Sequence, residues 1–358
     1  MKILHLVTSL DFGGVERRME ILSKYPSSSN KLTFCALGGG GRAYQIMSEN
    51  GANVRLLGCD FRIFRVGTLL SLLRYINRLR PDIIHAHGAE ANFYGGLAGL
   101  LLRVKVRIAE EIGIPSYSKK SKQVFRLVFK MYHSVIAMSP AVKEFLCNRN
   151  VVDSDKIDLV CNPVLMSSVL KSDYVSGDCV DFSYLGRLEK VKNPDGLLRA
   201  FHLFLDQGGS AKLHFIGDGS LAVNLKDYVA VHGLNKHVFF HGYSSDPFSI
   251  LLKTDVVVQP SHSEGFSLAL VEAMSCGLPA LATPFGGALD LLEDGGGWLI
   301  SSSEDQDILE GLNRVIQEKS EIKVQGEKAL DVVGNRFDAR EYSGELDMYY
   351  SLLMKQLQ

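Results

Sequence analysis

Short apolar runs alternate with amphipathic or glycine-bounded segments along almost the whole chain. The segments between the runs have the spacing of helices, for example at 66–79, 89–102, 193–206 and 304–318. The runs themselves predict thirteen strands, at 2–9, 32–37, 53–58, 82–88, 106–112, 134–139, 157–164, 180–188, 212–219, 238–243, 256–261, 279–285 and 297–300. Regular alternation of strand and helix is typical of parallel sheets with crossover connections, and thirteen strands fit two sheets of about six or seven.

One polar stretch, residues 166–179, interrupts this alternation and is predicted to be a linker. It divides the 358 residues into two α/β domains, 1–165 and 166–340, each long enough for a core of its own. The last segment, about 341–358, has the pattern of a helix with no strand after it. We expect this helix to cross back onto the first domain.

Cysteine usage and the absence of long apolar runs bear on location. Six cysteines are scattered without the spacing of a disulfide framework or a zinc site, which is typical of reduced thiols in the cytosol. The N-terminal run reads as a first strand and not as a secretion signal, and no run approaches the roughly 18 apolar residues of a membrane span. We therefore expect a cytoplasmic protein.

The net charge of −1 conceals an uneven distribution. Residues 1–165 hold 23 Lys and Arg against 13 Asp and Glu, a net charge of +10, whereas residues 166–358 hold 16 against 27, a net charge of −11. A basic domain indicates an anionic partner, such as membrane headgroups, a lipid phosphate or nucleic acid. Nucleic acid is the weaker option because no recognition motif accompanies the charge.

Two carboxylates, Glu264 and Glu272, flank the start of a predicted helix that runs from Ser267 to Cys276. The apolar strand 256–261 precedes them, so the turn lies at the carboxyl end of a strand, where ligands bind in open α/β sheets. Free amides at a helix start favour an anion such as phosphate, and carboxylates accept hydrogen bonds from sugar hydroxyls. The segment predicts a ligand that has both phosphate and hydroxyl groups.

Two cations, Arg187 and Lys192, follow the first strand of the second domain, immediately before a predicted helix that opens at Asn193. A pair of cations in one such loop could neutralise a diphosphate and the charge that builds on it when it departs. By residue type alone, a pair of solvated surface charges is the better explanation.

Glycine-rich turns follow the first two strands. Gly13 and Gly14 precede a helix and would let backbone amides approach a phosphate, although by themselves they indicate only a tight turn. The run 38–41 is interpreted as a loop at the rim of a ligand site.

Two histidines, His85 and His87, share one face of a predicted strand, with His87 nearer its carboxyl end. A histidine on a buried strand is more often a core residue than a catalyst. Metal binding would need a third ligand that the sequence does not place, so no metal site is predicted.

Residues 117–133 place five cations among apolar residues. Such a segment is suited to lying on an anionic membrane. It is equally consistent with an ordinary amphipathic helix whose apolar face packs in the core.

These residues belong to a series of motifs that extends over nearly the whole chain. In order they are GGVERRM (13–19), DIIHAHG (82–88), AMSPAVKEFL (137–146), CNPV (161–164), LGRLEKVKNPDGLLRAF (185–201), FIGDGS (215–220), HGYSSD (241–246), EGFSLALVEAMSCGLPALATPFGG (264–287) and GGWLI. The series resembles the retaining glycosyltransferases of family four, which have the GT-B fold and use nucleotide-sugar donors. The resemblance implies two Rossmann-like domains with parallel sheets facing a central cleft, the first binding the acceptor and the second the donor.

The resemblance also implies roles for individual residues. Four would serve catalysis: Arg187 and Lys192 on the diphosphate, Glu264 beside the sugar ring and His87 against the transferred sugar. Glu272 would accept hydrogen bonds from the ribose. Ten more residues would contact the donor, namely Gly13, Gly14, Gly217, Gly219, Gly242, Tyr243, Gly265, Phe266, Ser267 and Leu268. Many relatives have Gly where Ser267 stands, so its side chain is expected to narrow the site.

The implied reaction is metal-independent sugar transfer with retention of configuration. Retaining hydrolases use two carboxylates about 5 Å apart, but here one carboxylate is assigned to ribose, which favours front-side attack assisted by the leaving phosphate. We expect a UDP-sugar donor as substrate, no cofactor, and a lipid-linked or saccharide acceptor in surface polysaccharide synthesis, with peripheral contact to an anionic membrane through the basic domain.

Two other functions stay open. A nucleotide-sugar 2-epimerase would share the fold and the donor, and a non-catalytic nucleotide-sugar-binding subunit would share the site. A nicotinamide enzyme is disfavoured because the GxGxxG turn and its acidic ribose partner are missing.

Overall fold

The computed structural model describes residues 1–11, 13–111, 118–167, 169–172, 174, 179–244, 246–264, 266–285 and 287–357. These residues divide into two compact units, here called unit 1 (Met1–Pro163 with Ala339–Gln358) and unit 2 (Val164–Asp338). The two boundaries of unit 2, at Val164 and Asp338, each lie two residues before the boundaries of 166 and 340 expected from the sequence.

Unit 1 is a seven-stranded parallel sheet with helices on both faces. Its strands are β1 (Lys2–Val7), β2 (Lys31–Ala36), β3 (Val54–Leu56), β4 (Ile83–His87), β5 (Val106–Glu111), β6 (Ser134–Ala137) and β7 (Ile157–Leu159). Its helices are α1 (Gly14–Lys24), α2 (Arg42–Glu49), α3 (Val66–Leu79), α4 (Ala89–Leu101), α5 (Lys119–Lys130), α6 (Pro140–Asn148) and α14 (Ala339–Gln356). The strand order is β3-β2-β1-β4-β5-β6-β7.

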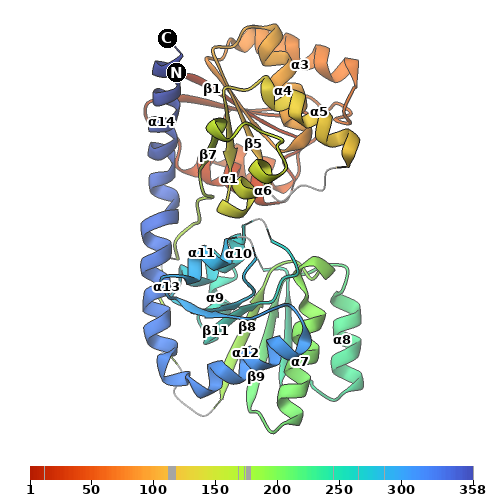
Figure 1. Cartoon of the computed structure of the whole chain (residues 1–358), viewed down its shortest axis with the longest axis vertical. Coiled ribbons are helices and arrows are strands. Elements are labelled where there is room, and N and C mark those ends of the chain that lie inside the picture. Colours follow the sequence, from red (N-terminus) through yellow and green to blue (C-terminus); the bar gives the residue numbers. More distant parts are fainter. Residues whose placement is uncertain are drawn as a thin grey trace. The chain divides into compact units, whose positions relative to one another are not determined.

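The sheet of unit 1 has a separate core on each face. One core holds apolar side chains of α3, α4 and α5, among them Leu72, Tyr94 and Phe129. The other holds side chains of α1 and α2 together with Tyr342, Leu346, Tyr350 and Leu353 of α14. The C-terminal helix therefore completes the second core of unit 1, and Figure 1 shows it beside β1.

Unit 2 is a six-stranded parallel sheet in the order β10-β9-β8-β11-β12-β13. Its strands are β8 (Val180–Leu185), β9 (Ala211–Ile216), β10 (Val238–Gly242), β11 (Val256–Gln259), β12 (Ala280–Ala282) and β13 (Gly297–Leu299). Its helices are α7 (Pro194–Asp206), α8 (Ala222–Val231), α9 (Phe248–Leu251), α10 (Leu268–Met274), α11 (Ala288–Leu292), α12 (Asp305–Gln317) and α13 (Ile322–Phe337).

All thirteen predicted strands form, and the α/β fold with two parallel sheets is confirmed. Most of the observed strands end earlier than predicted, because the apolar runs continue into the loops at the carboxyl ends of the strands. Within the described ranges, no helix is both long enough and apolar enough to cross a bilayer.

Candidate functional site

The sheet of unit 2 changes direction between β8 and β11. From β8 the chain proceeds to β9 and β10 on one side, and it then returns to β11 on the other side of β8. The loops that follow β8 and β11 therefore leave from adjacent strand ends and diverge. Such a point is where ligands bind in open α/β sheets.

An ion pair between Lys192 and Glu264 joins these two loops. Lys192 ends the short 3-10 helix after β8, and Glu264 lies in the loop between β11 and α10. The ammonium of Lys192 donates directly to the carboxylate of Glu264, with only 16% and 14% of the two side chains exposed. Water therefore screens this pair weakly, which strengthens the attraction. The structure thus brings together two residues for which the sequence predicted separate ligand contacts.

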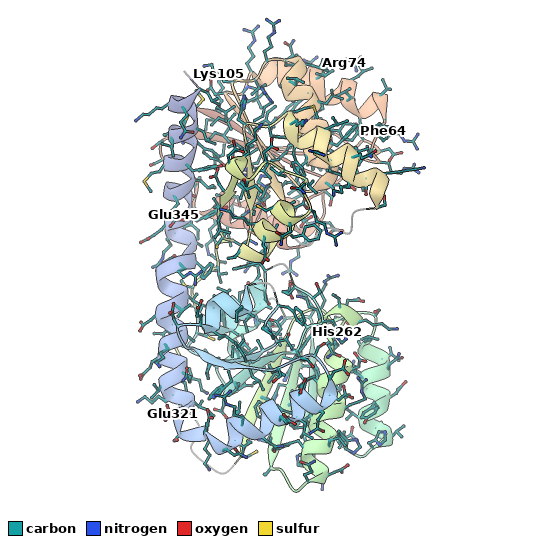
Figure 2. The ribbon with its side chains drawn as sticks, in the orientation of Figure 1. Phe64, Arg74, Lys105, His262, Glu321 and Glu345 are labelled. Atoms are coloured by element: carbon teal, nitrogen blue, oxygen red, sulfur yellow. The ribbon has the colours of Figure 1, made fainter. Side chains whose placement is uncertain are left out.

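Backbone and side-chain contacts fix the positions of both loops. The backbone N–H of His262 donates to Val191 O at 2.9 Å, which links the loop after β11 to the loop after β8. Asn193 adopts a left-handed conformation (φ 56°), and its side chain accepts from Gly196 N and donates to Ser303 O at 2.8 Å. Asn tolerates this conformation better than most residues, so it can both end the 3-10 helix and begin α7. His262, labelled in Figure 2, contacts Ser303 Oγ at 2.7 Å.

Arg187 lies in the same loop as Lys192 and is exposed. Its backbone is held in place because Tyr184 Oη donates to Arg187 O at 2.8 Å. No side chain among the described residues forms an ion pair with its guanidinium. Arg187 therefore offers a cation without an ion-pair partner among the described residues, in the same loop as Lys192.

Two of the glycines that were predicted to contact the donor, Gly217 and Gly219, let neighbouring loops approach each other. Gly217 has a φ of 145°, and a Cβ there would lie 1.9 Å from Gly186 O. A Cβ on Gly219 would lie 2.6 Å from Leu188 O. These two glycines permit the loops after β8 and β9 to touch, which is a structural requirement whatever ligand binds. Gly242 ends β10 at a φ of 67° with open space around it.

The residues around the start of α10 differ from the prediction in one respect. Ser267 is buried, accepts from Leu270 N at 3.3 Å as the N-cap, and donates to the side chain of Gln259. Its hydroxyl is therefore committed to the protein interior and does not narrow a surface site, which corrects the expectation from the sequence.

The other predicted donor contacts in unit 2 lie on or near α10 and β10. Leu268 and Glu272 are partly exposed on one side of α10, one turn apart. Phe266 packs against Phe337 with ring centroids 5.5 Å apart. Tyr243, after β10, is exposed, and Gly265 lies outside the described residues.

In unit 1, the start of α1 is occupied by one of its own side chains. Gly13 is the N-cap of α1, and the Glu16 carboxylate folds back over it, so that a Cβ on Gly13 would lie 2.5 Å from Glu16 Oε2. Burial raises the pKa of Glu16, and the neighbouring carboxylates of Asp11 and Glu20 contribute to the rise. A phosphate at Gly13 and Gly14 would first have to displace this carboxylate.

A buried polar cluster lies beneath the carboxyl ends of β1, β4 and β5. Its centre is Glu110, which accepts from the Arg18 guanidinium and lies 3.0 Å from His87 Nδ1 and 3.2 Å from His85 Nε2. Burial alone would raise the pKa of Glu110, but Arg18 and the two histidines hold it well below its usual value. Glu110 is therefore ionised, with the Arg18 guanidinium donating to it and one nitrogen of each histidine beside it.

The other nitrogens of His85 and His87 also have partners within the protein. His87 Nε2 lies 3.0 Å from His5 Nδ1, and His85 Nδ1 lies 2.9 Å from Tyr350 Oη. His87 Nδ1 faces both Glu110 and the Arg18 guanidinium, and His5 Nε2 has no hydrogen-bond partner among the described residues. Burial lowers the pKa of each histidine, that of His87 to about 3, so all three imidazoles are neutral.

This placement corrects the prediction for His87. The residue is only 2% exposed and both of its ring nitrogens face protein groups, so no nitrogen is presented to a sugar. The sequence placed no third ligand for a metal ion beside His85 and His87. The structure brings a third histidine there, His5, which pairs with His85 in the β1–β4 register. The nitrogens of His5, His85 and His87 lie within 4.8 Å of one another, a geometry that could hold a metal ion. The Arg18 guanidinium, 2.9 Å from His87 Nδ1, opposes a cation there.

Comparisons with known proteins give the context for this site. The family model for glycosyl transferases group 1 matches residues 177–331, and the model for glycosyltransferase family 4 matches residues 12–166. The capsular polysaccharide biosynthesis glycosyltransferase CapM of Staphylococcus aureus is 23% identical over 99% of this chain and 98% of its own length. An Escherichia coli protein named UDP-Gal:alpha-D-GlcNAc-diphosphoundecaprenol alpha-1,3-galactosyltransferase is 27% identical over 70% of both chains.

Solved structures show the same fold. The Anabaena protein HepE, in complex with UDP and glucose, has a TM-score of 0.82 at 20% identity and covers 98% of this chain and 99% of its own. The apo form of the lipopolysaccharide outer core galactosyltransferase WaaB has a TM-score of 0.78 at 21% identity, with 98% and 99% covered.

Proposed function

Because this chain belongs to the group 1 glycosyl transferases of glycosyltransferase family 4, we propose that it transfers a sugar from a UDP-sugar to a lipid-linked or saccharide acceptor, with retention of configuration. The product would be a surface polysaccharide such as capsule, O-antigen or exopolysaccharide. The observation that carries the proposal is the Lys192–Glu264 pair at the change of direction in the unit 2 sheet.

The donor part of the proposal rests on the charges in unit 2. Arg187 offers a guanidinium to the diphosphate, and Lys192 is held beside it by Glu264. When the donor binds, the diphosphate competes with Glu264 for the Lys192 ammonium, which leaves the carboxylate free to accept from sugar hydroxyls. Glu272, one turn into α10, accepts from the ribose hydroxyls. The relative named for UDP-Gal and the neighbour that holds UDP and glucose support a uridine donor.

The chemical step follows from where charge develops. As the bond between the sugar and the diphosphate breaks, negative charge grows on the leaving phosphate, and two preorganised cations stabilise it more in the transition state than in the ground state. These cations could supply the stabilisation for which other enzymes use a metal ion. The leaving phosphate takes the proton of the acceptor hydroxyl on the same face of the sugar, which gives retention. His87 has no direct contact with the sugar in this proposal, since it is part of the buried cluster.

Unit 1 takes the acceptor in this proposal. Its predicted basic character suits a diphosphate-linked lipid, and one relative is named for such an acceptor. Peripheral contact with an anionic membrane would bring the protein to that acceptor.

Thermal shift with a panel of nucleotide sugars, followed by turnover, tests the proposal. The true donor at a hundred times its dissociation constant stabilises the protein by about 2.7 kcal/mol. Free sugar or glycoside with retained configuration supports the transferase. An epimeric donor would indicate the 2-epimerase, and binding without turnover would indicate a non-catalytic subunit.

Substitution within one loop separates catalysis from general charge effects. Lys192→Gln should lower kcat/KM by about a hundredfold or more, the scale of losing one preorganised donor. Lys190→Gln, in the same 3-10 helix but pointing to solvent, is the matched control and should leave kcat/KM unchanged. Equal effects of the two substitutions would remove Lys192 from the site, and a trapped covalent adduct at Glu264 would exclude front-side attack.

A further inference from the structure

The segment between Asp60 and Asp82 in unit 1 has an unusual charge pattern. It contains five arginines and no Asp or Glu, the arginines being Arg62, Arg65, Arg74, Arg78 and Arg80. The segment comprises α3 and the loop that leads into it. Neither the donor site nor the buried cluster uses any of these side chains.

The loop before α3 presents an aromatic ring to solvent. Phe64 has a φ of 71°, and 72% of its surface is exposed. A bulky side chain is rarely found in this left-handed region, and such residues concentrate at functional sites. The rings of Phe64 and Phe93 meet edge to face, with centroids 5.1 Å apart.

Hydrogen bonds hold this loop in one conformation. Tyr94 Oη donates to Arg62 O at 2.5 Å and accepts from Arg65 N at 2.9 Å. Thr68 Oγ1 donates to Asp60 O at 2.6 Å, which ties the loop to the first turn of α3. Phe64 is therefore held outward by a fixed backbone and does not depend on a mobile loop for its exposure.

The outward face of α3 continues the same surface. Val66 and Leu70, one turn apart, are exposed, and Arg74 follows one turn later. The opposite side of the helix is buried through Leu72 and Ile76. Figure 2 labels Phe64 on the loop and Arg74 on the helix. We call this face the α3 surface and define it by Arg62, Phe64, Arg65, Val66, Leu70 and Arg74.

Helix α5, the segment singled out in the sequence, has a different character. Phe125, Val128 and Phe129 pack in the core of unit 1, so its apolar stripe is not available to a membrane. Only Leu127 is a large exposed apolar side chain among those described on α5. The structure therefore supports the core-helix interpretation for residues 118–133, and the exposed face of α5 contributes charge and the single apolar side chain of Leu127.

We propose that the α3 surface docks this protein onto an anionic phospholipid bilayer. The proposal rests on the peripheral membrane contact of the proposed function and names the surface that makes it. Exposed apolar side chains enter the interfacial region while arginines contact lipid phosphates, the combination that interfacial helices use. Asp60, at the start of the segment, pairs with Arg62 and Arg65 within the chain, whereas Arg74 forms no ion pair among the described residues. A two-fold contact between copies of this surface would therefore oppose unpaired arginines and leave only the already paired Asp60 to balance them.

Sedimentation with vesicles at low salt tests the proposal through a matched pair of substitutions. Val66→Asp places a carboxylate on the α3 surface, and Val223→Asp does the same on α8 of unit 2; both valines are 68% exposed and lie in the first turn of their helix. On vesicles of phosphatidylglycerol and phosphatidylcholine, Val66→Asp should lower the partition coefficient at least tenfold, while Val223→Asp should leave it unchanged. Loss of Arg74 should cost about fivefold, and loss of Arg62 or Arg65, which share Asp60 as a counter-ion, should cost less.

A second measurement identifies the occupant of the surface. Phe64→Trp adds a reporter, because the chain's one tryptophan, Trp298, is buried in unit 2. Brominated lipids should quench the new tryptophan and leave the emission of Trp298 unaffected. Absence of quenching, or self-association that Val66→Asp abolishes, overturns the proposal.

The outcomes separate this inference from the wider proposed function. If the unaltered protein does not bind anionic vesicles, both the membrane contact and the α3 surface are wrong. If it binds but Val66→Asp binds equally well, only the assignment to the α3 surface is wrong. Stabilisation by the nucleotide sugar, measured in parallel on both variants, tests the donor site independently of either result.

Discussion

Replacing Glu110 by Gln should destabilise unit 1 severely, although the two side chains have almost the same size and shape. Glu110 is fully buried and Arg18 is 1% exposed. The substitution removes the negative charge and leaves the guanidinium buried without a counter-ion. Breaking a buried pair on one side costs about 3–5 kcal/mol. His85 and His87 also lose a charged acceptor, and a single amide oxygen replaces only part of it.

A companion variant tests the same reasoning in the opposite direction. In Arg18→Met with Glu110→Gln no unpaired charge is buried, so the double variant should be more stable than Glu110→Gln alone. Urea unfolding at neutral pH measures both. Far-UV circular dichroism follows the unfolding of both units, and Trp298 emission follows unit 2 only. The urea midpoint measured by Trp298 emission should therefore be unchanged. A Glu110→Gln protein within about 1 kcal/mol of the original, or a double variant less stable than the single one, would refute the account.

Three further outcomes are expected. Unit 1 should lose stability as pH falls below about 6.5, because burial lowers the pKa of its three clustered histidines. Below this pH the histidines of the unfolded chain bind protons that those of the folded chain do not. The free energy of unfolding should therefore fall by up to about 1.4 kcal/mol per pH unit for each histidine. Urea midpoints that stay flat from neutral to mildly acidic pH would contradict this. Tyr350→Phe should lower the free energy of urea unfolding at neutral pH by about 1–3 kcal/mol, since it leaves His85 Nδ1 buried without its hydrogen-bond partner. Gly217→Ala should unfold unit 2 at markedly lower urea than Gly208→Ala, because both glycines have positive φ but only Gly217 faces a clash.

The sequence was sufficient for the fold because the central strands are buried on both faces. Their runs are mostly apolar and the helices between them are amphipathic, so the alternation specifies parallel sheets directly. The loops were harder to predict, since the same apolar character continues past the end of a strand. The prediction for 157–164, for example, extends five residues beyond Leu159, where β7 ends.

The candidate site was predictable in part. Lys192 and Glu264 are 72 residues apart, and only the placement of β8 beside β11 explains why they pair. His5 could have been found by the same reasoning, because it occupies the position on β1 that faces His85 on β4. The role of Phe64 could not, since its exposure depends on a left-handed backbone and a clamp from Tyr94 that leave no periodic signal.

The distribution of unit 1 over both ends of the chain has a consequence for biosynthesis. Tyr342, Leu346 and Tyr350, near the end of the chain, fill one of its two cores. A growing polypeptide therefore carries a first domain with an open apolar face until the final helix leaves the ribosome. Unit 2 lies wholly within one continuous stretch, with Val164 N bonded to Phe337 O where its ends meet, so it can finish folding earlier. The domain that is translated first is the last to be completed.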